Sequence, residues 1–195
     1  MRTQEWASAT GSRRTASRSA DVGVTLIECD RTRSAEILAI LNEAIANSTA
    51  LYDYQQRTMA MMDTWFDAKL KGNYPVIGAV DESGRLLGFA TYGMFRERPA
   101  YKYTVEHSVY VESECRGRGV GRVLLAALIE RAKAQNYHVL IGGIDGDNAV
   151  SIEMHKKFGF TFCGEIREAG FKFGRWLHLH FYQLILDTPA HPVDG

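Results

Sequence analysis

Apolar residues alternate between a helical and a strand-like spacing along most of the chain. Positions three or four apart, first over 37–45 and then over 59–70, indicate two amphipathic helices that follow a short strand at 23–29. Two further helices are expected, over 123–136 and 148–158. The remaining strands are expected at 74–80, 85–93, 103–111, 138–144, 160–166 and 176–186. The resulting order, βααβββαβαββ, predicts one domain of mixed α/β class.

The first 22 residues lack this periodicity. They are rich in Ser, Thr, Ala and Arg, and residues 1–20 contain a single acid, Glu5. We expect residues 1–22 to form a disordered tail, and we favour this interpretation over a transit peptide, which the composition also suggests. The expected domain therefore spans 23–187 and is followed by a short tail at 188–195.

The bulk composition narrows the classes of function. Lys and Arg together number 23, as do Asp and Glu, so the formal net charge is zero. This balance favours neither a nucleic acid nor a membrane surface as partner, and no apolar stretch of about 18 residues indicates a membrane span. The three cysteines form no CxxC pair, which fits a reduced, cytoplasmic protein better than a disulfide scaffold or a zinc site.

One segment combines glycine and arginine at the expected start of a helix. It reads ECRGRGVGRVLL, residues 114–125, and follows the strand expected at 103–111. The first turn of a helix has unpaired N–H groups and a partial positive charge, and glycines let a ligand approach the backbone. This segment therefore predicts a site for phosphate groups, with a tight turn and solvated arginines as the simpler alternative. Its spacing, G-x-G-x-G, matches neither a Walker A loop nor a dinucleotide-binding fingerprint.

The same segment resembles the Arg/Gln-x-x-Gly-x-Gly/Ala loop of the GNAT superfamily of N-acetyltransferases. Four other segments resemble its phosphinothricin acetyltransferase branch: ANSTALYDYQQRT, TVEHSVYV, DNAVSIEMHKKFGF and REAGFKFGRWLHLHFYQL. The resemblance runs from about Val24 to Leu186. It implies a single α/β (α+β) domain whose mixed, mostly antiparallel sheet has about seven strands, two of them splayed at its centre, flanked by about four helices. It also implies acetyl-coenzyme A (acetyl-CoA) as co-substrate, no metal and a homodimer.

The resemblance further implies how acetyl-CoA is held. The pantetheine arm would pair with the backbone near Val109 and Val111, in the gap between the splayed strands. Asn148 and Ser151 match positions that contact the pantetheine, although capping of the helix that follows Asp147 is an alternative role for them. The diphosphate would bind to Arg116, Gly117, Arg118, Gly119, Val120, Gly121 and Arg122.

Acetyl transfer requires a neutral amine, and a free α-amine has a pKa of roughly 8, so a base must accept its proton. Glu106 is the candidate, because an acid is unusual in mid-strand and the resembling branch has a catalytic Glu in this motif; an outward surface position is the alternative. The branch also has a His where many GNAT members have Tyr. His155 matches it and would orient the substrate, relay the proton or assist the leaving thiolate. His107 is left out, because strand alternation turns it away from Glu106.

The expected acceptor is a small-molecule amine, an amino acid or analogue of the phosphinothricin or methionine sulfoximine/sulfone type with an anionic end. We expect Tyr52, Arg96 and Tyr101 to bind it, and Arg98 is chemically equivalent to Arg96. Two alternatives remain open. One is acetylation of another amine, such as a protein N-terminus or a polyamine. The other is a non-catalytic CoA-binding module, which need not retain both catalytic candidates.

Overall fold

The computed structural model describes residues 18–19 and 23–194. The expected order of helices and strands is confirmed. The helices are α1 (Ser34–Asn47), α2 (Met59–Lys71), α3 (Val120–Ala134) and α4 (Ala149–Lys157). The strands are β1 (Arg18–Ser19), β2 (Val24–Glu28), β3 (Val76–Val80), β4 (Leu86–Met94), β5 (Thr104–Val111), β6 (Val139–Asp145), β7 (Thr161–Lys172) and β8 (Arg175–Ile185). Most of the expected N-terminal tail lies outside the described residues, but its β1 pairs with β2.

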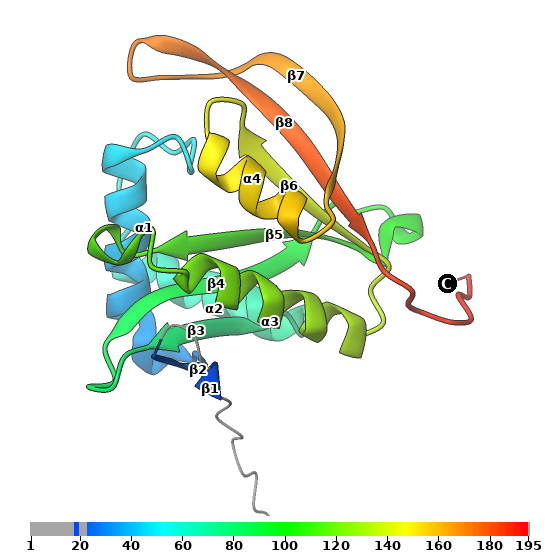
Figure 1. Ribbon diagram of the computed structural model, residues 1–195, viewed down its shortest axis with the longest axis horizontal. Helices are drawn as coiled ribbons and strands as arrows, with labels where there is room; N and C mark the ends of the chain where they lie inside the picture. Colours follow the sequence, from blue (N-terminus) through cyan, green and yellow to red (C-terminus); the bar gives the residue numbers. More distant parts are fainter. Residues whose placement is uncertain (1–17, 20–22, 195) are drawn as a thin grey trace, which may run out of the picture.

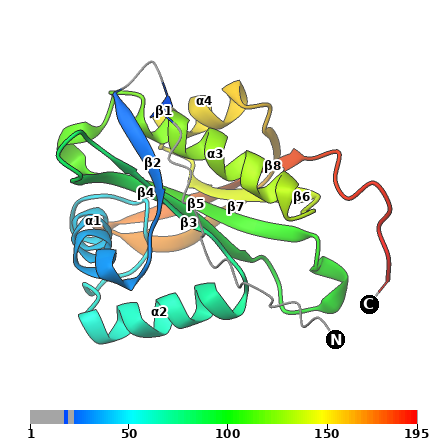
Figure 2. The same cartoon turned by 90° about the horizontal axis from the view of Figure 1, so that it is seen from below.

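The strands form one mixed sheet in the order β1-β2-β3-β4-β5-β6-β8-β7. Neighbouring strands are antiparallel except for β5 and β6, which are parallel. Helices α1 and α2 cover one face of the sheet, and α3 and α4 cover the other (Figures 1 and 2). This arrangement confirms the expected sheet of about seven strands, to which β1 adds a two-residue edge.

The two central strands separate part-way along their length. Their pairing comprises Thr104 with Val139, Val105 with Leu140 and Glu106 with Ile141. Beyond this point β5 stays paired with β4 as far as Val111, while β6 stays paired with β8 as far as Asp145. The expected splay is therefore present, and it leaves the facing edges of β5 and β6 without a ladder between them.

Glycines in β6 make room for side chains of β5 where the strands separate. A Cβ atom on Gly142 would lie 3.0 Å from His107 Cε1, and one on Gly143 would lie 3.0 Å from Glu106 Oε1. Because neighbouring residues of a strand point to opposite faces, His107 and Glu106 fill the two sides of the opening.

A hydrophobic core lies on each face of the sheet. Under α3 it includes Leu124 and Leu128, both fully buried, and under α1 and α2 it includes Ile37 and Met62. The apolar residues of α2 are less buried than their helical spacing suggests. Phe66 is 6% exposed, but Met59 and Leu70 are 50% and 79% exposed, because α2 turns only its Met62 and Phe66 side toward the core.

Strand β7 is longer than the segment expected at 160–166. It continues to Lys172 through register shifts against β8 between Phe162 and Gly164 and between Ile166 and Gly170. Together the two strands form a long hairpin whose outer strand is an edge of the sheet. The tip of this hairpin lies over the loop between α1 and α2 (Figure 1).

Candidate active site

A cavity of about 290 Å³ occupies the opening between β5 and β6. The loop after α1 supplies one wall with residues 49–52. The two strands and α4 supply the others, through Glu106, His107, Ser108, Val109, Tyr110, Gly142, Gly143, Ile144, Asp145, Asn148, Ser151, His155 and, from β8, Leu179. The described lining contains two carboxylates and no lysine or arginine.

The two catalytic candidates enter this cavity from opposite faces of the sheet. Tyr110, two pleats from Glu106, packs on the α1–α2 core, whereas Val109 packs on the α3 core. Glu106 therefore faces the α1–α2 side, and His107 faces the α3–α4 side together with His155. The cavity connects the two faces because the strands have no ladder at this level.

Glu106 is half-buried in the cavity wall. Burial raises the pKa of its carboxyl above the ordinary value, and the positive charge of Arg96 partly opposes this change. A carboxylate with a raised pKa is a better proton acceptor near neutral pH than a fully solvated one.

His155 is 4% exposed and has contacts at both ring nitrogens. Nδ1 lies 2.7 Å from the carbonyl oxygen of Ser151, so Nδ1–H is the donor there. Its Nε2 is therefore the acceptor in the 2.9 Å contact with Nε2 of His107, which donates. The sequence correctly predicts that His107 points away from Glu106. It does not predict that His107 contacts His155.

The glycine–arginine segment forms the turn that leads into α3. Gly117 and Gly119 have φ angles of 74° and 85°, a left-handed conformation that favours glycine. Gly119 is the N-cap of α3 and makes no side-chain hydrogen bond to it, so no side chain caps the backbone N–H groups of the first turn. A Cβ on Gly121 would lie 3.4 Å from Met154 Sδ. The glycine–arginine turn and its bare helix start fit an anionic phosphate group.

The three arginines of this segment differ in their contacts. Arg116 pairs with Glu43 of α1 and donates from Nε to the carbonyl of Val111, at 3.3 Å. Arg118 and Arg122 are exposed, and neither has an ion pair among the described residues. Two of the three guanidinium groups are thus available to a ligand at the start of α3.

Asn148 and Ser151 belong to the capped start of α4 and also line the cavity. Asn148 is the N-cap of α4, and its Oδ1 accepts a hydrogen bond from the N–H of Ser151 at 3.1 Å. Both residues also line the cavity. Capping accounts for their local geometry, and their position leaves them within the opening between the strands.

Only one of the three expected acceptor-binding residues lines the cavity. Tyr52 lines the cavity and packs against the hairpin, where a Cβ on Gly170 would be 2.7 Å from Tyr52 Cδ2. Arg96 and Tyr101 are both exposed, pack against Phe95 and are absent from the described lining. The structure therefore brings only Tyr52 to the cavity, and Arg96 acts on Glu106 only through its charge.

Asp145 is a cavity residue that was not expected from the sequence. Its side chain is 1% exposed and lines the cavity at the end of β6, and its Oδ1 accepts a hydrogen bond from the N–H of Asp147 at 3.1 Å. Burial raises the pKa of Tyr52, and the negative charge of Asp145 adds to this change. The available signal was an acid directly after a buried apolar strand.

Comparison with known proteins identifies the fold that carries this cavity. A family model described as the acetyltransferase (GNAT) domain matches residues 32–181. The chain belongs to the GNAT acetyltransferase family. The expected fold and reaction class, together with acetyl-CoA as co-substrate, are confirmed for this GNAT chain.

Several relatives match nearly the whole GNAT domain. An L-methionine sulfoximine/L-methionine sulfone acetyltransferase of Pseudomonas paraeruginosa is 47% identical over 151 residues, 77% of this chain and 88% of that protein. A solved structure from Acinetobacter baylyi, described as an acetyltransferase, has a TM-score of 0.87 at 54% identity and covers 88% of this chain and 97% of that one. A phosphinothricin acetyltransferase of Sinorhizobium meliloti, solved with acetyl-CoA, has a TM-score of 0.84 at 34% identity, covering 87% and 92%.

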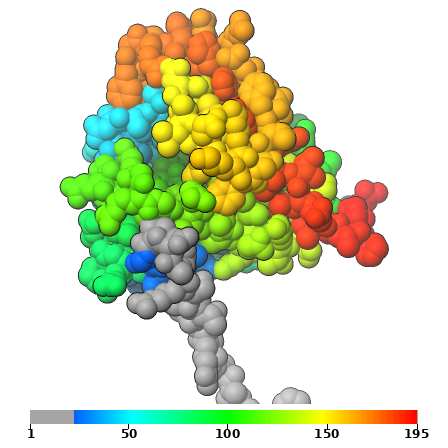
Figure 3. Space-filling model, viewed as in Figure 1, coloured from blue at the N-terminus to red at the C-terminus, as the bar shows by residue number. Residues whose placement is uncertain are grey.

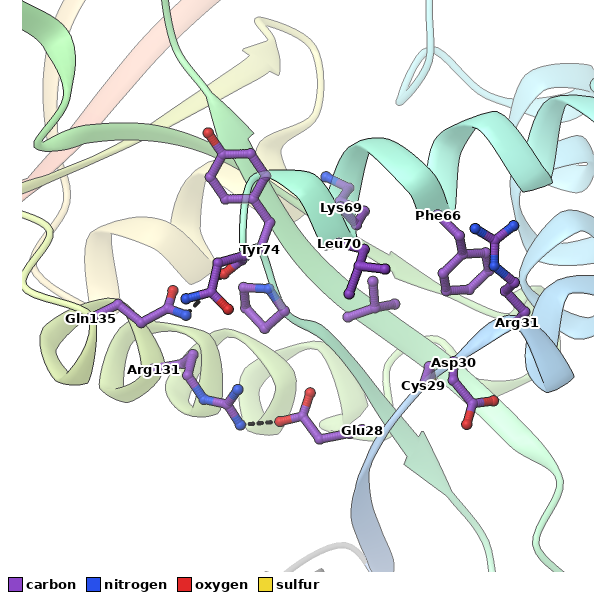
Figure 4. Close-up of a pocket in the computed structure, with 13 residues that line it drawn as sticks. Glu28, Cys29, Asp30, Arg31, Phe66, Lys69, Leu70, Tyr74, Arg131 and Gln135 are labelled. Carbon is purple, nitrogen blue, oxygen red and sulfur yellow. Dashed lines mark hydrogen bonds and ion pairs between the residues drawn. The ribbon is translucent and has the colours of Figure 1, made fainter. Parts of the chain in front are cut away.

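A second cavity of this GNAT chain, about 280 Å³ in volume, lies between the end of β2, α2 and α3 (Figure 4). Lys69 donates there to the carbonyl of Tyr92 at 2.8 Å, and burial lowers the pKa of Lys69 to about 8. Arg131 pairs with Glu28 at its rim. This cavity shares no lining residue with the one between β5 and β6.

The described residues contain neither a metal-binding cluster nor a membrane-spanning helix. Among residues 18–19 and 23–194, no group of three or more His, Cys, Asp or Glu side chains is placed to hold a metal ion. Within the same residues, every helix is too short or too polar to cross a membrane.

The buried histidine pair makes the stability of the GNAT chain dependent on pH. Burial, with a smaller contribution from His155, lowers the pKa of His107 from 6.5 to about 3. Between these values the unfolded chain binds more protons than the folded chain, so the free energy of unfolding rises with pH. We expect His107→Gln, which retains a donor for His155, to reduce this slope by about 1.4 kcal/mol per pH unit.

Urea unfolding at pH 4 to 6.5 measures this slope. His191→Asn is the control, because His191 is exposed near the C-terminus and should leave the slope unchanged. An equal slope in His107→Gln and the unsubstituted chain would show that His107 is not held neutral by burial.

Proposed function

We propose that this chain transfers the acetyl group of acetyl-CoA to the α-amine of a small amino acid of the methionine sulfoximine, methionine sulfone or phosphinothricin type. The observation that carries the proposal is the opening between β5 and β6. The bare start of α3, with its exposed arginines, lies beside the open edge of β5, where a Cβ on Gly121 would be 3.6 Å from Val111 Cγ2. Glu106 lies on the opposite side of the sheet. Such an opening lets two substrates meet from opposite faces.

The carrier side of the opening is the face with α3 and α4. The unpaired edges of β5, near Val109 and Val111, and of β6 offer backbone groups to the pantetheine arm, as an added strand would use them. Arg118, Arg122 and the N–H groups of the first turn of α3 would hold the diphosphate. Asn148 and Ser151 border the same path.

Glu106 is the proposed general base. When bound, acetyl-CoA supplies a thioester carbonyl that a neutral amine attacks, and the proton lost from that amine passes to a Glu106 carboxylate oxygen. Glu106 lies on the α1–α2 side and lines the same cavity as Tyr52 and Asp145, where the acceptor would bind. The carbon–sulfur bond of the thioester then breaks, which would release coenzyme A as the thiolate and leave an amide.

We propose that His155 shapes the acetyl-CoA side of the opening rather than acting as the general base. Its Nδ1–H donates to Ser151 and its Nε2 accepts from His107, so neither nitrogen is directed at Glu106. Both imidazole rings lie close to the backbone of Gly142. A Cβ on Gly142 would lie 3.0 Å from His107 and 3.5 Å from His155. The pair thus fixes the shape of the opening next to the thioester.

We also propose that the chain is a cytoplasmic homodimer. Apolar side chains are exposed along the β7–β8 hairpin, at Phe162, Ile166, Phe171, Phe173 and Trp176, and a second copy would cover them. The three free cysteines fit a reducing compartment. Sedimentation should give twice the chain mass, and Phe162→Glu with Ile166→Glu should shift it toward the monomer.

A thiol-release assay with acetyl-CoA tests the activity. We expect release of free coenzyme A with methionine sulfone, methionine sulfoximine or phosphinothricin, and an N-acetylated product by mass spectrometry. A panel should include spermidine and a peptide with a free N-terminus, which represent the other amine classes. Turnover confined to either of these would overturn the amino-acid assignment.

Replacement of the proposed base tests the mechanism. We expect Glu106→Gln to lower kcat by about two to four orders of magnitude, because an amide cannot accept the proton. The unsubstituted chain should gain activity as pH rises through the pKa of Glu106, which burial places above 4.5, and the variant should lack this limb. The matched control is Glu97→Gln, at an exposed position beside Arg96. An unchanged rate and pH profile in Glu106→Gln would remove Glu106 from the mechanism.

A further inference from the structure

Lys172, at the tip of the β7–β8 hairpin, uses its ammonium group entirely inside the protein. The residue is 4% exposed. Its Nζ donates to three backbone carbonyls, those of Ile45 at 2.7 Å, Ser48 at 2.9 Å and Leu51 at 2.6 Å. An ammonium group has three N–H donors, so these carbonyls account for all of them. No carboxylate pairs with Lys172 among the described residues.

These carbonyls belong to the end of α1 and to the loop that follows it. The last carbonyls of a helix have no partner within the helix and carry a partial negative charge, which a cation stabilises. Ile45 is in the last turn of α1, and Ser48 is its C-cap. Lys172 therefore caps α1 from more than 120 residues away, and the same ammonium group fixes the chain at Leu51.

The loop that Lys172 holds is a wall of the cavity between β5 and β6. Residues 49–52 all line that cavity. The hairpin makes two more contacts with this loop, a 2.6 Å hydrogen bond from the Tyr54 hydroxyl to the carbonyl of Phe171, and the packing of Tyr52 on Gly170. In Figure 3 the cyan surface of this region lies directly against the orange surface of the hairpin.

We propose that Lys172 is a positioning residue, whose ammonium group holds residues 48–52 in place as the acceptor-side wall of the cavity. The loop lies on the α1–α2 side, with Glu106, and not on the side of α3 and its glycine turn. Loss of the ammonium group should therefore weaken acceptor binding and leave acetyl-CoA binding unchanged. This rests on the proposed function, because it assigns the α1–α2 side to the acceptor.

The decisive variant is Lys172→Met, which retains the aliphatic stem and removes the three donors. We expect KM for methionine sulfone to rise roughly tenfold or more, since hydrogen bonds from a charged group are among the strong ones, and KM for acetyl-CoA to stay within about twofold. Hydrogen exchange of the amides of residues 48–58 should accelerate. Lys71→Met, at an exposed end of α2, is the matched control and should change none of the three.

A second variant covers the case in which Lys172→Met does not fold. Tyr54 is 74% exposed, so Tyr54→Phe removes one hydrogen bond between loop and hairpin without touching the core. It should raise the same KM by a smaller factor, about twofold to fivefold. An unchanged acceptor KM in both variants, or an equal rise in both KM values, would overturn the proposal.

The proposed function and this inference can fail separately. If the unsubstituted chain acetylates no amino acid, the proposed function is wrong, and the exchange rates of residues 48–58 alone decide whether Lys172 holds the loop. If amino acids are acetylated but Lys172→Met matches Lys71→Met in KM and exchange, the function stands and the positioning role is wrong.

Discussion

The end of the β5–β6 pairing at Glu106 is the constraint on which the rest of the structure depends. Each strand stays bonded to its outer neighbour, β4 or β8, so the sheet remains continuous while its centre opens. Gly142 and Gly143 keep the opening free of β6 side chains, because larger residues there would crowd His107 and Glu106. The opening joins the two faces of the sheet. Glu106 lies on the α1–α2 face, and the His107–His155 pair lies on the α3–α4 face.

Three elements distant in sequence define the surroundings of this opening. The glycine turn into α3 places bare N–H groups and two exposed arginines at the end where we propose that acetyl-CoA binds. The α4 helix, capped by Asn148, places His155 against His107. The β7–β8 hairpin reaches over the other face and holds the loop after α1 through Lys172. The cavity is therefore formed by contacts between layers rather than by any single motif.

Local patterns explain what could be predicted from the sequence. Apolar periodicity located the helices and strands, and the glycine spacing located the start of α3, because both depend on neighbouring residues. Alternation along β5 correctly separated Glu106 from His107. The contact of His107 with His155 and the burial of Lys172 depend on how distant elements pack. Arg96 and Tyr101 were expected to bind the acceptor, but their loop places them outside the described cavity lining.

A solved complex with acetyl-CoA tests the central claim most directly. The account predicts that the diphosphate lies at the first turn of α3, that the pantetheine follows the open edge of β5, and that the acetyl group lies in the opening beside Gly142. A carrier bound elsewhere, for example in the cavity beside Lys69, with β5 and β6 joined by a continuous ladder beyond Glu106, would contradict it.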